Sequence, residues 1–411
     1  GDRLSLLYHL SQQFNSSLDL DEVLNRVMDE VISAVRAERG FVMLKDQFGK
    51  LNFRVARGMD QKTIEDPEFQ VSRSVIQKVA EDGEPILTSD AQSDLRFNMR
   101  QSVMAMGLRS ILCAPLKIKD KLTGVIYVDN RLRAGIFTAA DMELLSYIAS
   151  SAAIAIENAR LYQVAIDKGK LEQELQSARQ VQAALLPKEI PIISGWEFDA
   201  FWQPAREVGG DYYDFIPLPG ERLGLVIADV TDKGMPAALF MASTKNIIRS
   251  SAGTRDDIAE EVSQANRLIE AESDERMFVS LVCARLDLRS GKFNYVNAGH
   301  NPPLYYNIKN KKLTPLERTG MWLGVDPNNE FVQRSITMDK GDFVLFYTDG
   351  VPDAINKEEM EFGMPRLEKI LLKNASLPPE VIRQVIIKGI AEFVSPAEPF
   401  DDITLMIIKR I

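Results

Sequence analysis

Residues 223–242 read LGLVIADVTDKGMPAALFMA. The first six residues form an apolar run that is typical of a buried strand, and Asp229 ends that run. A helical segment follows at residues 236–251. A strand that stops at an acid and leads directly into a helix predicts a mixed fold with Asp229 at the edge of a sheet.

Four further acids are placed in the same way. Asp349 ends the run FVLFYT, Asp211 follows two glycines in REVGGDYYDF, and the pair Asp401 and Asp402 precedes ITLMII. A single acid at a strand end usually caps a turn through the local backbone. Acids that converge at one edge of a sandwich would repel one another unless cations lay among them. Carboxylate oxygens select Mg²⁺ or Mn²⁺, so the pattern predicts a centre of two such ions.

The region around these acids, residues 191–411, forms the predicted C-terminal domain. Short β-rich runs alternate there with helical segments, which predicts two packed sheets flanked by helices. The runs are FDAFWQPA, LGLVIADV, MFVSLVCARLDL, KFNYVNAG, DFVLFYTDGV and ITLMIIKRI.

Residues 1–160 form a predicted N-terminal domain of the α+β class. Apolar residues recur at helical spacing over residues 4–14 and 17–35, and Asp19 or Asp21 is the expected cap of the second helix. From Arg39 the pattern changes to short β-branched runs, with one helical segment between them. We therefore expect one sheet covered by helices.

Residues 161–190 are a predicted linker helix. If Leu161 takes heptad position a, most positions of the seam are apolar and two are polar. Such a seam predicts a weak dimer contact, and a plain spacer helix is the alternative. Pro187 and Pro191 end the helix. The seam positions are Leu161, Val164, Lys168, Leu171, Leu175, Ala178, Gln182 and Leu185.

The composition of the chain argues against some classes of function. The chain has 411 residues and a net charge of −10, which argues against nucleic-acid binding, since phosphate neutralisation needs a concentrated basic surface. Its two cysteines lie in apolar runs, as expected of reduced thiols in the cytoplasm. The longest uncharged run, residues 144–156, is too short to span a bilayer, so no membrane partner is expected. The sequence begins at Gly1 without a methionine, so upstream sequence could be missing.

Residues 18–161 resemble a GAF domain. The resemblance rests on AERGFVML, GEPILTSDAQSD, RSILCAPL and LTGVIYVDNRLRAGIFTAADMELLSYIA. Asn130, Phe137 and Asp141 match part of the signature of GAF domains that bind cyclic nucleotides, but Met142 stands where that signature has a glutamate. The resemblance implies an antiparallel sheet with helices, and either a small-molecule sensor or a structural, dimerising module.

Five blocks of the C-terminal half resemble the SpoIIE/RsbU-like branch of the PPM metal-dependent serine/threonine protein phosphatases. The blocks are REVGGDYYD, IADVTDKGMPAALFMA, NAGHNPPL, LFYTDGVPDA and FDDITL. The resemblance implies an αββα sandwich and a metal-activated hydroxide that hydrolyses phosphoserine or phosphothreonine on a protein. The implied protein substrate is a phosphorylated anti-sigma-factor antagonist.

The same resemblance implies a role for each acid. Asp229 would bridge two Mn²⁺ or Mg²⁺ ions, and the Val230 carbonyl would accompany it. Asp349 and Asp401 would hold the first ion, and Asp211 would lie near the second. Asp402, next to the last ligand, would support it and is counted with the metal-site residues.

Several positions leave alternatives open. Thr231 stands where many family members have a histidine, so the general acid is unassigned, and Arg206 is the nearest candidate for binding phosphate. His300 lies in a turn-rich block, which favours a structural role. The GGD of the first block is also found in diguanylate cyclases, but Tyr212 and Tyr213 do not fit their signature. A scaffold without catalysis, controlled by the GAF domain, is the alternative function.

Overall fold

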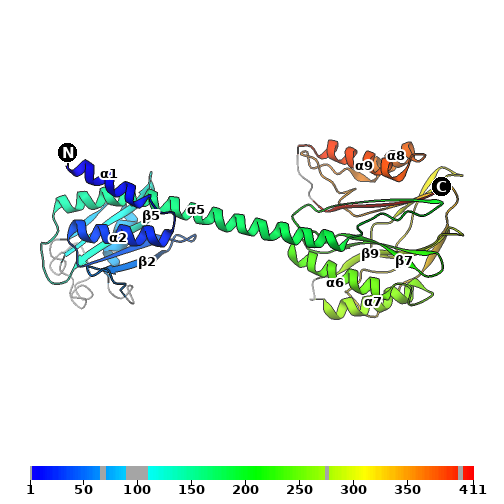
Figure 1. Cartoon of the computed structure of the whole chain (residues 1–411), viewed down its shortest axis with the longest axis horizontal. Coiled ribbons are helices and arrows are strands. Elements are labelled where there is room, and N and C mark those ends of the chain that lie inside the picture. Colours follow the sequence, from blue (N-terminus) through cyan, green and yellow to red (C-terminus); the bar gives the residue numbers. More distant parts are fainter. Residues whose placement is uncertain (1, 65–70, 89–109, 274–276, 397–400) are drawn as a thin grey trace. The chain divides into compact units, whose positions relative to one another are not determined.

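The structure is a computed structural model, and it describes all residues except 1, 65–70, 89–109, 274–276 and 397–400. Contacts divide the chain into two compact units, Gly1–Leu171 and Glu172–Ile411. Figure 1 traces the elements of both, and each unit is described by itself.

The first unit contains one five-stranded sheet in which every pair of neighbours is antiparallel. Its order is β2-β1-β5-β4-β3, and the longest strand, β5, lies at the centre. The antiparallel sheet predicted for this region is therefore confirmed. The strands are β1 (Arg39–Lys45), β2 (Leu51–Gly58), β3 (Ile86–Thr88), β4 (Ser110–Ile118) and β5 (Lys121–Asn130).

Helices cover both faces of this sheet. Side chains of α1 (Asp2–Phe14), α2 (Leu20–Val35) and α5 (Ala139–Leu185) share one buried cluster with one face of the sheet. Side chains of α3 (Arg73–Asp82) pack against the other face. The Asp19 carboxylate accepts the Glu22 amide at 2.9 Å, so Asp19 is the N-cap of α2.

The three residues that match the cyclic-nucleotide signature hold the local fold together. The Asn130 side chain accepts the amides of Leu132 and Arg133, and Phe137 is buried in the core. Asp141 accepts the amide and hydroxyl of Thr138, which fixes the start of α5. Residues 89–95, which include the end of the predicted segment GEPILTSDAQSD, lie outside the described residues.

Helix α5 contributes to both units. Its first half supplies Ala149, Ala152 and Ile156 to the core of the first unit. It is the one helix in the described part of the chain that could cross a membrane by length and composition, with a mean hydropathy of 1.3 over its most apolar stretch, of which 39% is buried. A single helix of this kind is weak evidence for a membrane span, because the core helix of a soluble protein meets the same criteria.

The predicted heptad seam of α5 divides into two parts. Leu161, Val164 and Leu171 are more than half exposed. In contrast, Gln182 is buried, with 4% of its surface exposed. The prediction that Gln182 is a polar position in a dimer seam is therefore wrong, because this side chain is already buried within its own unit.

The second unit contains two five-stranded sheets packed face to face. One has the order β13-β10-β9-β8-β7 and the other β12-β11-β14-β15-β6. The strands of the first sheet are β7 (Tyr212–Leu218), β8 (Arg222–Val230), β9 (Val279–Asp287), β10 (Lys292–Ala298) and β13 (Arg334–Thr337). Those of the second are β6 (Trp196–Gln203), β11 (Leu304–Asn307), β12 (Lys312–Pro315), β14 (Phe343–Tyr347) and β15 (Ile403–Arg410).

Two helices cover the outer face of each sheet, as Figure 1 shows for this unit. Helices α6 (Met235–Ser251) and α7 (Ile258–Glu272) share a cluster with the first sheet. Helices α8 (Gly363–Asn374) and α9 (Pro379–Val394) share one with the second. This arrangement confirms the predicted αββα sandwich.

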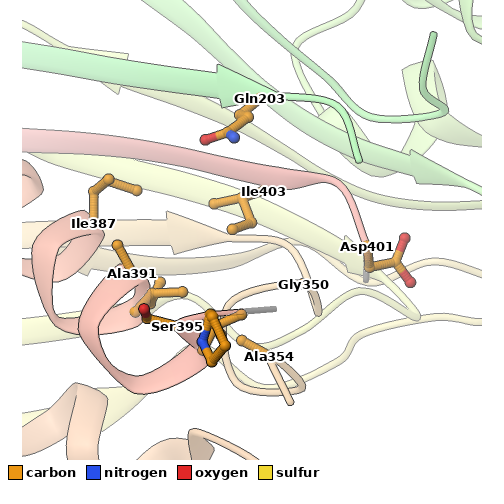
Figure 2. A pocket seen from close by; sticks show the side chains of 11 residues that line it. Gln203, Gly350, Ala354, Ile387, Ala391, Ser395, Asp401 and Ile403 are labelled. Carbon is orange, nitrogen blue, oxygen red and sulfur yellow. The ribbon is translucent and has the colours of Figure 1, made fainter. Parts of the chain in front are cut away.

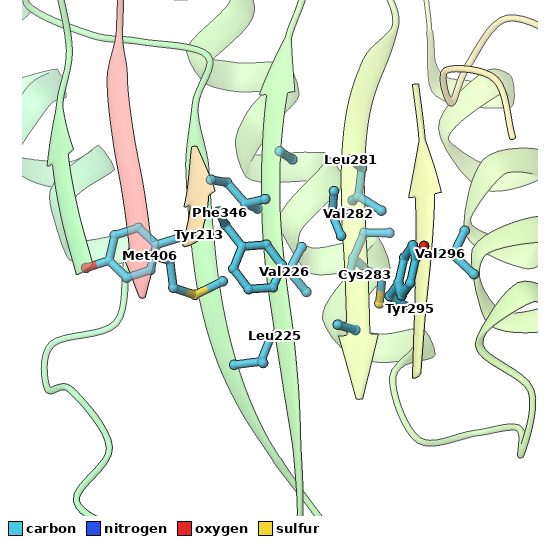
Figure 3. Packing of buried hydrophobic residues seen from close by; sticks show 14 of the residues in the cluster. Tyr213, Leu225, Val226, Leu281, Val282, Cys283, Tyr295, Val296, Phe346 and Met406 are labelled. Carbon is cyan, nitrogen blue, oxygen red and sulfur yellow. The ribbon is translucent and has the colours of Figure 1, made fainter. Parts of the chain in front are cut away.

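The core between the sheets is built from aromatic and branched side chains. Phe293 of the first sheet meets Phe346 of the second, with ring centroids 6.1 Å apart. Figure 3 shows Phe346 and Met406 of the second sheet in one cluster with Leu225 and Tyr295 of the first. The packed core fixes the strands of both sheets, so the loops at their ends start from rigid positions.

Candidate active site

The predicted acids lie where strands of the two sheets begin or end. Asp211 directly precedes β7, and Asp229 is the next-to-last residue of β8. Asp349 follows the end of β14, and Asp401 and Asp402 precede β15. The sandwich thus brings acids from four strands, separated by up to 191 residues in sequence, to one edge.

The acids are close enough to change one another's ionisation. Burial, together with the charge of Asp349, raises the pKa of Asp229 to about 8. Burial and the charge of Asp401 raise the pKa of Asp349 to about 6. Burial and the charges of Asp229 and Asp402 raise the pKa of Asp211 well above its usual value. Protons or cations must therefore compensate the negative charge at this edge.

Two threonine hydroxyls fix the side chain of Asp211. Thr348, just after β14, and Thr404, in β15, each donate to Asp211 Oδ2 at 2.7 Å. All three residues are buried. Asp211 precedes the first sheet while both threonines belong to the second, so these hydrogen bonds tie the sheets together at the site.

Asp402 organises the backbone around the site. Its Oδ1 accepts the Ala205 amide and its Oδ2 the Gly210 amide, both at 2.8 Å. A β-carbon on Gly209 would lie 2.2 Å from Asp402 Oδ2, so only glycine fits beside this carboxylate. Because both oxygens accept backbone amides, Asp402 suits a supporting role better than that of a direct ligand.

The carbonyl of Val230 lies against the loop that carries Asp211. A β-carbon on Gly210 would come within 2.7 Å of this oxygen. The Val230 amide in turn donates to the Gly210 carbonyl at 3.4 Å. The glycine pair therefore allows the chain before Asp211 to pass directly beside the end of β8.

Asp401 is paired with a lysine that precedes α6. Lys233 Nζ lies 3.0 Å from Asp401 Oδ2, and about a third of each side chain is exposed. Lys233 sits in the turn that joins β8 to α6, four residues after Asp229. The ammonium group thus places a positive charge at the open side of the acidic cluster.

Among the described residues, no three Asp, Glu, His or Cys side chains are arranged so that one metal ion could contact all of them. The contacts explain this: Asp402 faces amides, Asp211 faces threonine hydroxyls and Asp401 faces Lys233. The donor set nevertheless fits divalent cations. Burial and the neighbouring carboxylates raise the pKa values of Asp229 and Asp349, and bound Mg²⁺ or Mn²⁺ would favour the ionised carboxylates.

Two other sequence candidates take part in the local structure. His300 is buried, and its Nε2 lies 3.1 Å from the Tyr347 carbonyl, to which it must donate; its Nδ1 then accepts from Ser280 at 2.8 Å. Burial lowers the pKa of His300 to about 4, so the ring is neutral. The Thr231 hydroxyl donates to the Phe278 carbonyl and accepts its amide. Arg206 is exposed in the loop before Asp211.

Sequence reasoning missed three residues that support the site. Thr348 and Thr404 look like ordinary strand residues. Gln182, at the end of α5, contacts Gly209, but the heptad pattern places it on a seam. The available signals were a threonine directly before Asp349 and a second threonine two positions after Asp402.

A largely apolar cavity of about 350 Å³ opens beside the acids. Figure 2 shows Asp401 at one end and Ile387 and Ala391 of α9 towards the other. Of the acids in the cluster, only Asp401 lines this cavity. The cavity therefore borders the site without containing it.

Family profiles match both parts of the chain. Residues 219–411 match the stage II sporulation protein E (SpoIIE) family, and residues 19–156 match the GAF domain family. The first match includes Asp229, Asp349, Asp401 and Asp402 and begins after Asp211. The chain is therefore similar to the SpoIIE family over its C-terminal part and to the GAF domain family over its N-terminal part.

Two relatives show the extent of the similarity. Protein IcfG of Synechocystis sp. is 32% identical over 264 residues, which cover 58% of this chain and 41% of that protein. Phosphoserine phosphatase RsbU of Bacillus subtilis is 29% identical over 244 residues, which cover 59% of this chain and 71% of RsbU. The matches thus span less than half of IcfG and about seven tenths of RsbU.

Among solved structures, the SiaA-PP2C domain of Pseudomonas aeruginosa superposes with a TM-score of 0.53 at 18% identity. The superposition covers 60% of this chain and 98% of that domain. At this identity the likeness shows the fold, and it agrees with the αββα sandwich described above.

Proposed function

We propose that this protein, which carries a SpoIIE-like domain behind a GAF-like domain, is a metal-dependent serine/threonine protein phosphatase. The observation that carries the proposal is the convergence of Asp211, Asp229, Asp349 and Asp401 at one edge of the sandwich. The similarity to the phosphoserine phosphatase RsbU supports the reaction class.

Two Mn²⁺ or Mg²⁺ ions would supply an activated water and neutralise phosphate charge in this site. Asp229, the Val230 carbonyl, Asp349 and Asp401 are the proposed holders of these ions, with Asp211 near the second. Asp402 keeps the backbone before Asp211 in place through its two amide contacts. Thr231 is engaged with Phe278, so we assign the protonation of the leaving oxygen to another donor.

Hydrolysis of a phosphoserine peptide with and without Mn²⁺ tests this proposal. Asp229→Asn should lower the Mn²⁺-dependent rate by at least about 100-fold, because this carboxylate would hold the ions that neutralise the phosphate charge. Asp256→Asn, an exposed acid before α7, is the matched control and should behave as wild type. A rate that persists in Asp229→Asn refutes the metal assignment, and a wild-type chain without turnover supports the alternative of a non-catalytic scaffold.

For regulation, we propose that residues 1–160 are a sensory or dimerising domain and residues 161–190 a linker to the phosphatase at 191–411. Leu161, Val164 and Leu171 support a homodimer, because three exposed apolar side chains at heptad spacing suit a second copy of α5. A small-molecule ligand of the GAF domain remains a second route of control. The two buried free cysteines support a cytoplasmic location.

Sedimentation equilibrium tests the dimer. Val164→Lys should weaken self-association, because it places a charge on the apolar seam. Gln163→Lys, the control, adds the same charge one position away and can still pair with Asp167, which Gln163 now contacts. A wild-type chain that stays monomeric rules out the dimer and leaves the phosphatase proposal untouched.

The proposed substrate is a phosphorylated protein of the anti-sigma-factor antagonist class, and the resemblance to RsbU-like phosphatases supports it. Comparison of kcat/KM for such a phosphoprotein with that for a generic phosphoserine peptide tests this choice. Equal values for both would contradict recognition of this protein class.

A further inference from the structure

We propose that Gln182 is a positioning residue, through which the end of α5 holds the loop that carries Asp211. This inference rests on the proposed function and adds the contact that connects α5 to the metal site. Gln182 Nε2 donates to the Gly209 carbonyl at 2.5 Å, and the Gly209 amide donates to Gln182 Oε1 at 3.0 Å. Gln182 is 4% exposed, so water competes little for either hydrogen bond.

The paired hydrogen bonds take the place of a neighbouring strand. In an antiparallel ladder two residues exchange both amide hydrogen bonds, and here one side-chain amide satisfies both backbone groups of Gly209. Strand β7, which begins three residues later, lies at the end of its sheet. Gln182 therefore secures the backbone just before an edge strand, on the side that no other strand of that sheet covers.

Several side chains hold the segment from Ala205 to Asp211. Asp402 holds the amides of Ala205 and Gly210, the two threonines hold the Asp211 carboxylate, and Gln182 holds Gly209 between them. Of these anchors, Gln182 alone lies on α5, whereas the others lie within or directly beside β14 and β15. A displacement of the last turn of α5 would therefore move Gly209 relative to anchors that stay fixed.

The helix that carries Gln182 also belongs to the first unit. Ala149, Ala152 and Ile156 of α5 lie in the core of that unit, and the same helix continues without interruption to Leu185. A shift or rotation of the helix can thus reach Gly209 through one side chain. This gives the proposed control by the GAF domain a specific contact at the metal-site end.

The test compares full-length wild type, Gln182→Leu, Gln182→Glu and the control Gln180→Leu. Gln180 is exposed on the same turn. Isothermal titration with Mn²⁺ measures metal affinity, and hydrogen exchange of residues 204–212 reports on the loop. We expect Gln182→Leu to weaken Mn²⁺ binding about 10- to 100-fold, as for other residues that orient metal ligands, and to speed exchange in the loop. Gln180→Leu should match wild type in both.

Gln182→Glu tests the inference if Gln182→Leu does not fold. Glutamate has the same length and can still accept the Gly209 amide, but it cannot donate to the Gly209 carbonyl. We therefore expect weaker Mn²⁺ binding and faster exchange in the loop, as for Gln182→Leu. Wild-type Mn²⁺ affinity and wild-type exchange in a folded Gln182 variant would overturn the inference. If wild type binds Mn²⁺ but hydrolyses no phosphoserine, the proposed function fails while the Gln182 comparison still stands. If wild type binds no Mn²⁺, both fall.

Discussion

Replacement of Gly350 by alanine should damage the site through backbone crowding. Gly350 follows Asp349 and packs against the residues before β15. A β-carbon there would lie 1.9 Å from the Asp402 carbonyl oxygen, whereas real contacts of this kind stay beyond 3.0 Å. One of the two segments must therefore retreat by about 1 Å, the difference between these distances, and both segments carry acids of the site.

This displacement sets the expected losses of stability and of turnover. Overpacking of a well-packed interior costs about 1–3 kcal/mol of unfolding free energy. In a unit of this size each kcal/mol lowers Tm by about 2–4 °C. A misplacement of 1 Å in a catalytic group costs on the order of 100-fold in rate, so Mn²⁺-dependent turnover should fall by about that factor.

Thermal unfolding and phosphoserine hydrolysis at saturating Mn²⁺ check both parts. Gly169→Ala is the control, since no atom lies within 4 Å of the position of its β-carbon. If Gly350→Ala matches the control in Tm and turnover, the close approach of the two segments is wrong. If Tm falls while turnover is unchanged, the two segments are crowded, but their displacement does not move the acids of the site.

Three further changes test the packing of the second unit. Arg285→Met should lower the unfolding free energy by about 3–5 kcal/mol in a denaturant titration, because it leaves the buried carboxylate of Glu261 without its ion-pair partner. Arg289→Met, which removes the exposed ion pair with Glu221, is the control and should have no measurable effect. Tyr212→Phe should raise stability by about 1 kcal/mol, since in the described residues its buried hydroxyl has no partner; a loss of stability would show that a partner exists. Between pH 6.5 and about pH 4, His300 is neutral in the folded protein but takes up a proton in the unfolded chain. The unfolding free energy should therefore fall by up to about 1.4 kcal/mol for each pH unit as the pH drops through this range, and it should lose nothing from His300 above pH 6.5. His300→Gln should remove this pH dependence, and an unchanged dependence would contradict the lowered pKa of His300.

The acids could be predicted from the sequence because each one interrupts a strong local pattern. Asp229 and Asp349 end apolar runs, and Asp401 and Asp402 begin one, so the alternation of strand and acid is visible without any knowledge of distant contacts. The two-sheet fold follows from the same runs. The prediction of converging acids then needed only the rule that strand ends of packed sheets share an edge.

The supporting residues could not be predicted because their partners are distant in sequence. Thr348 and Thr404 suit any strand, and only the folded sandwich places both beside Asp211. Gln182 fits a heptad, yet its partner is the backbone of a glycine 27 residues away. Asn130 and Asp141 match a ligand-binding signature, although their side chains form a turn and a helix start that any sequence with these residues could form.

The pairing of β6 with β15 has a consequence for how the protein is made. Ile403 pairs with Gln203 and Arg410 with Trp196, and β6 lies at the end of its sheet, so β15 is its neighbour there. During synthesis on the ribosome, β6 emerges roughly 200 residues before its partner, which is about 10–40 s at ordinary elongation rates. For that time its apolar side chains and free backbone edge are open to chaperones and to neighbouring nascent chains.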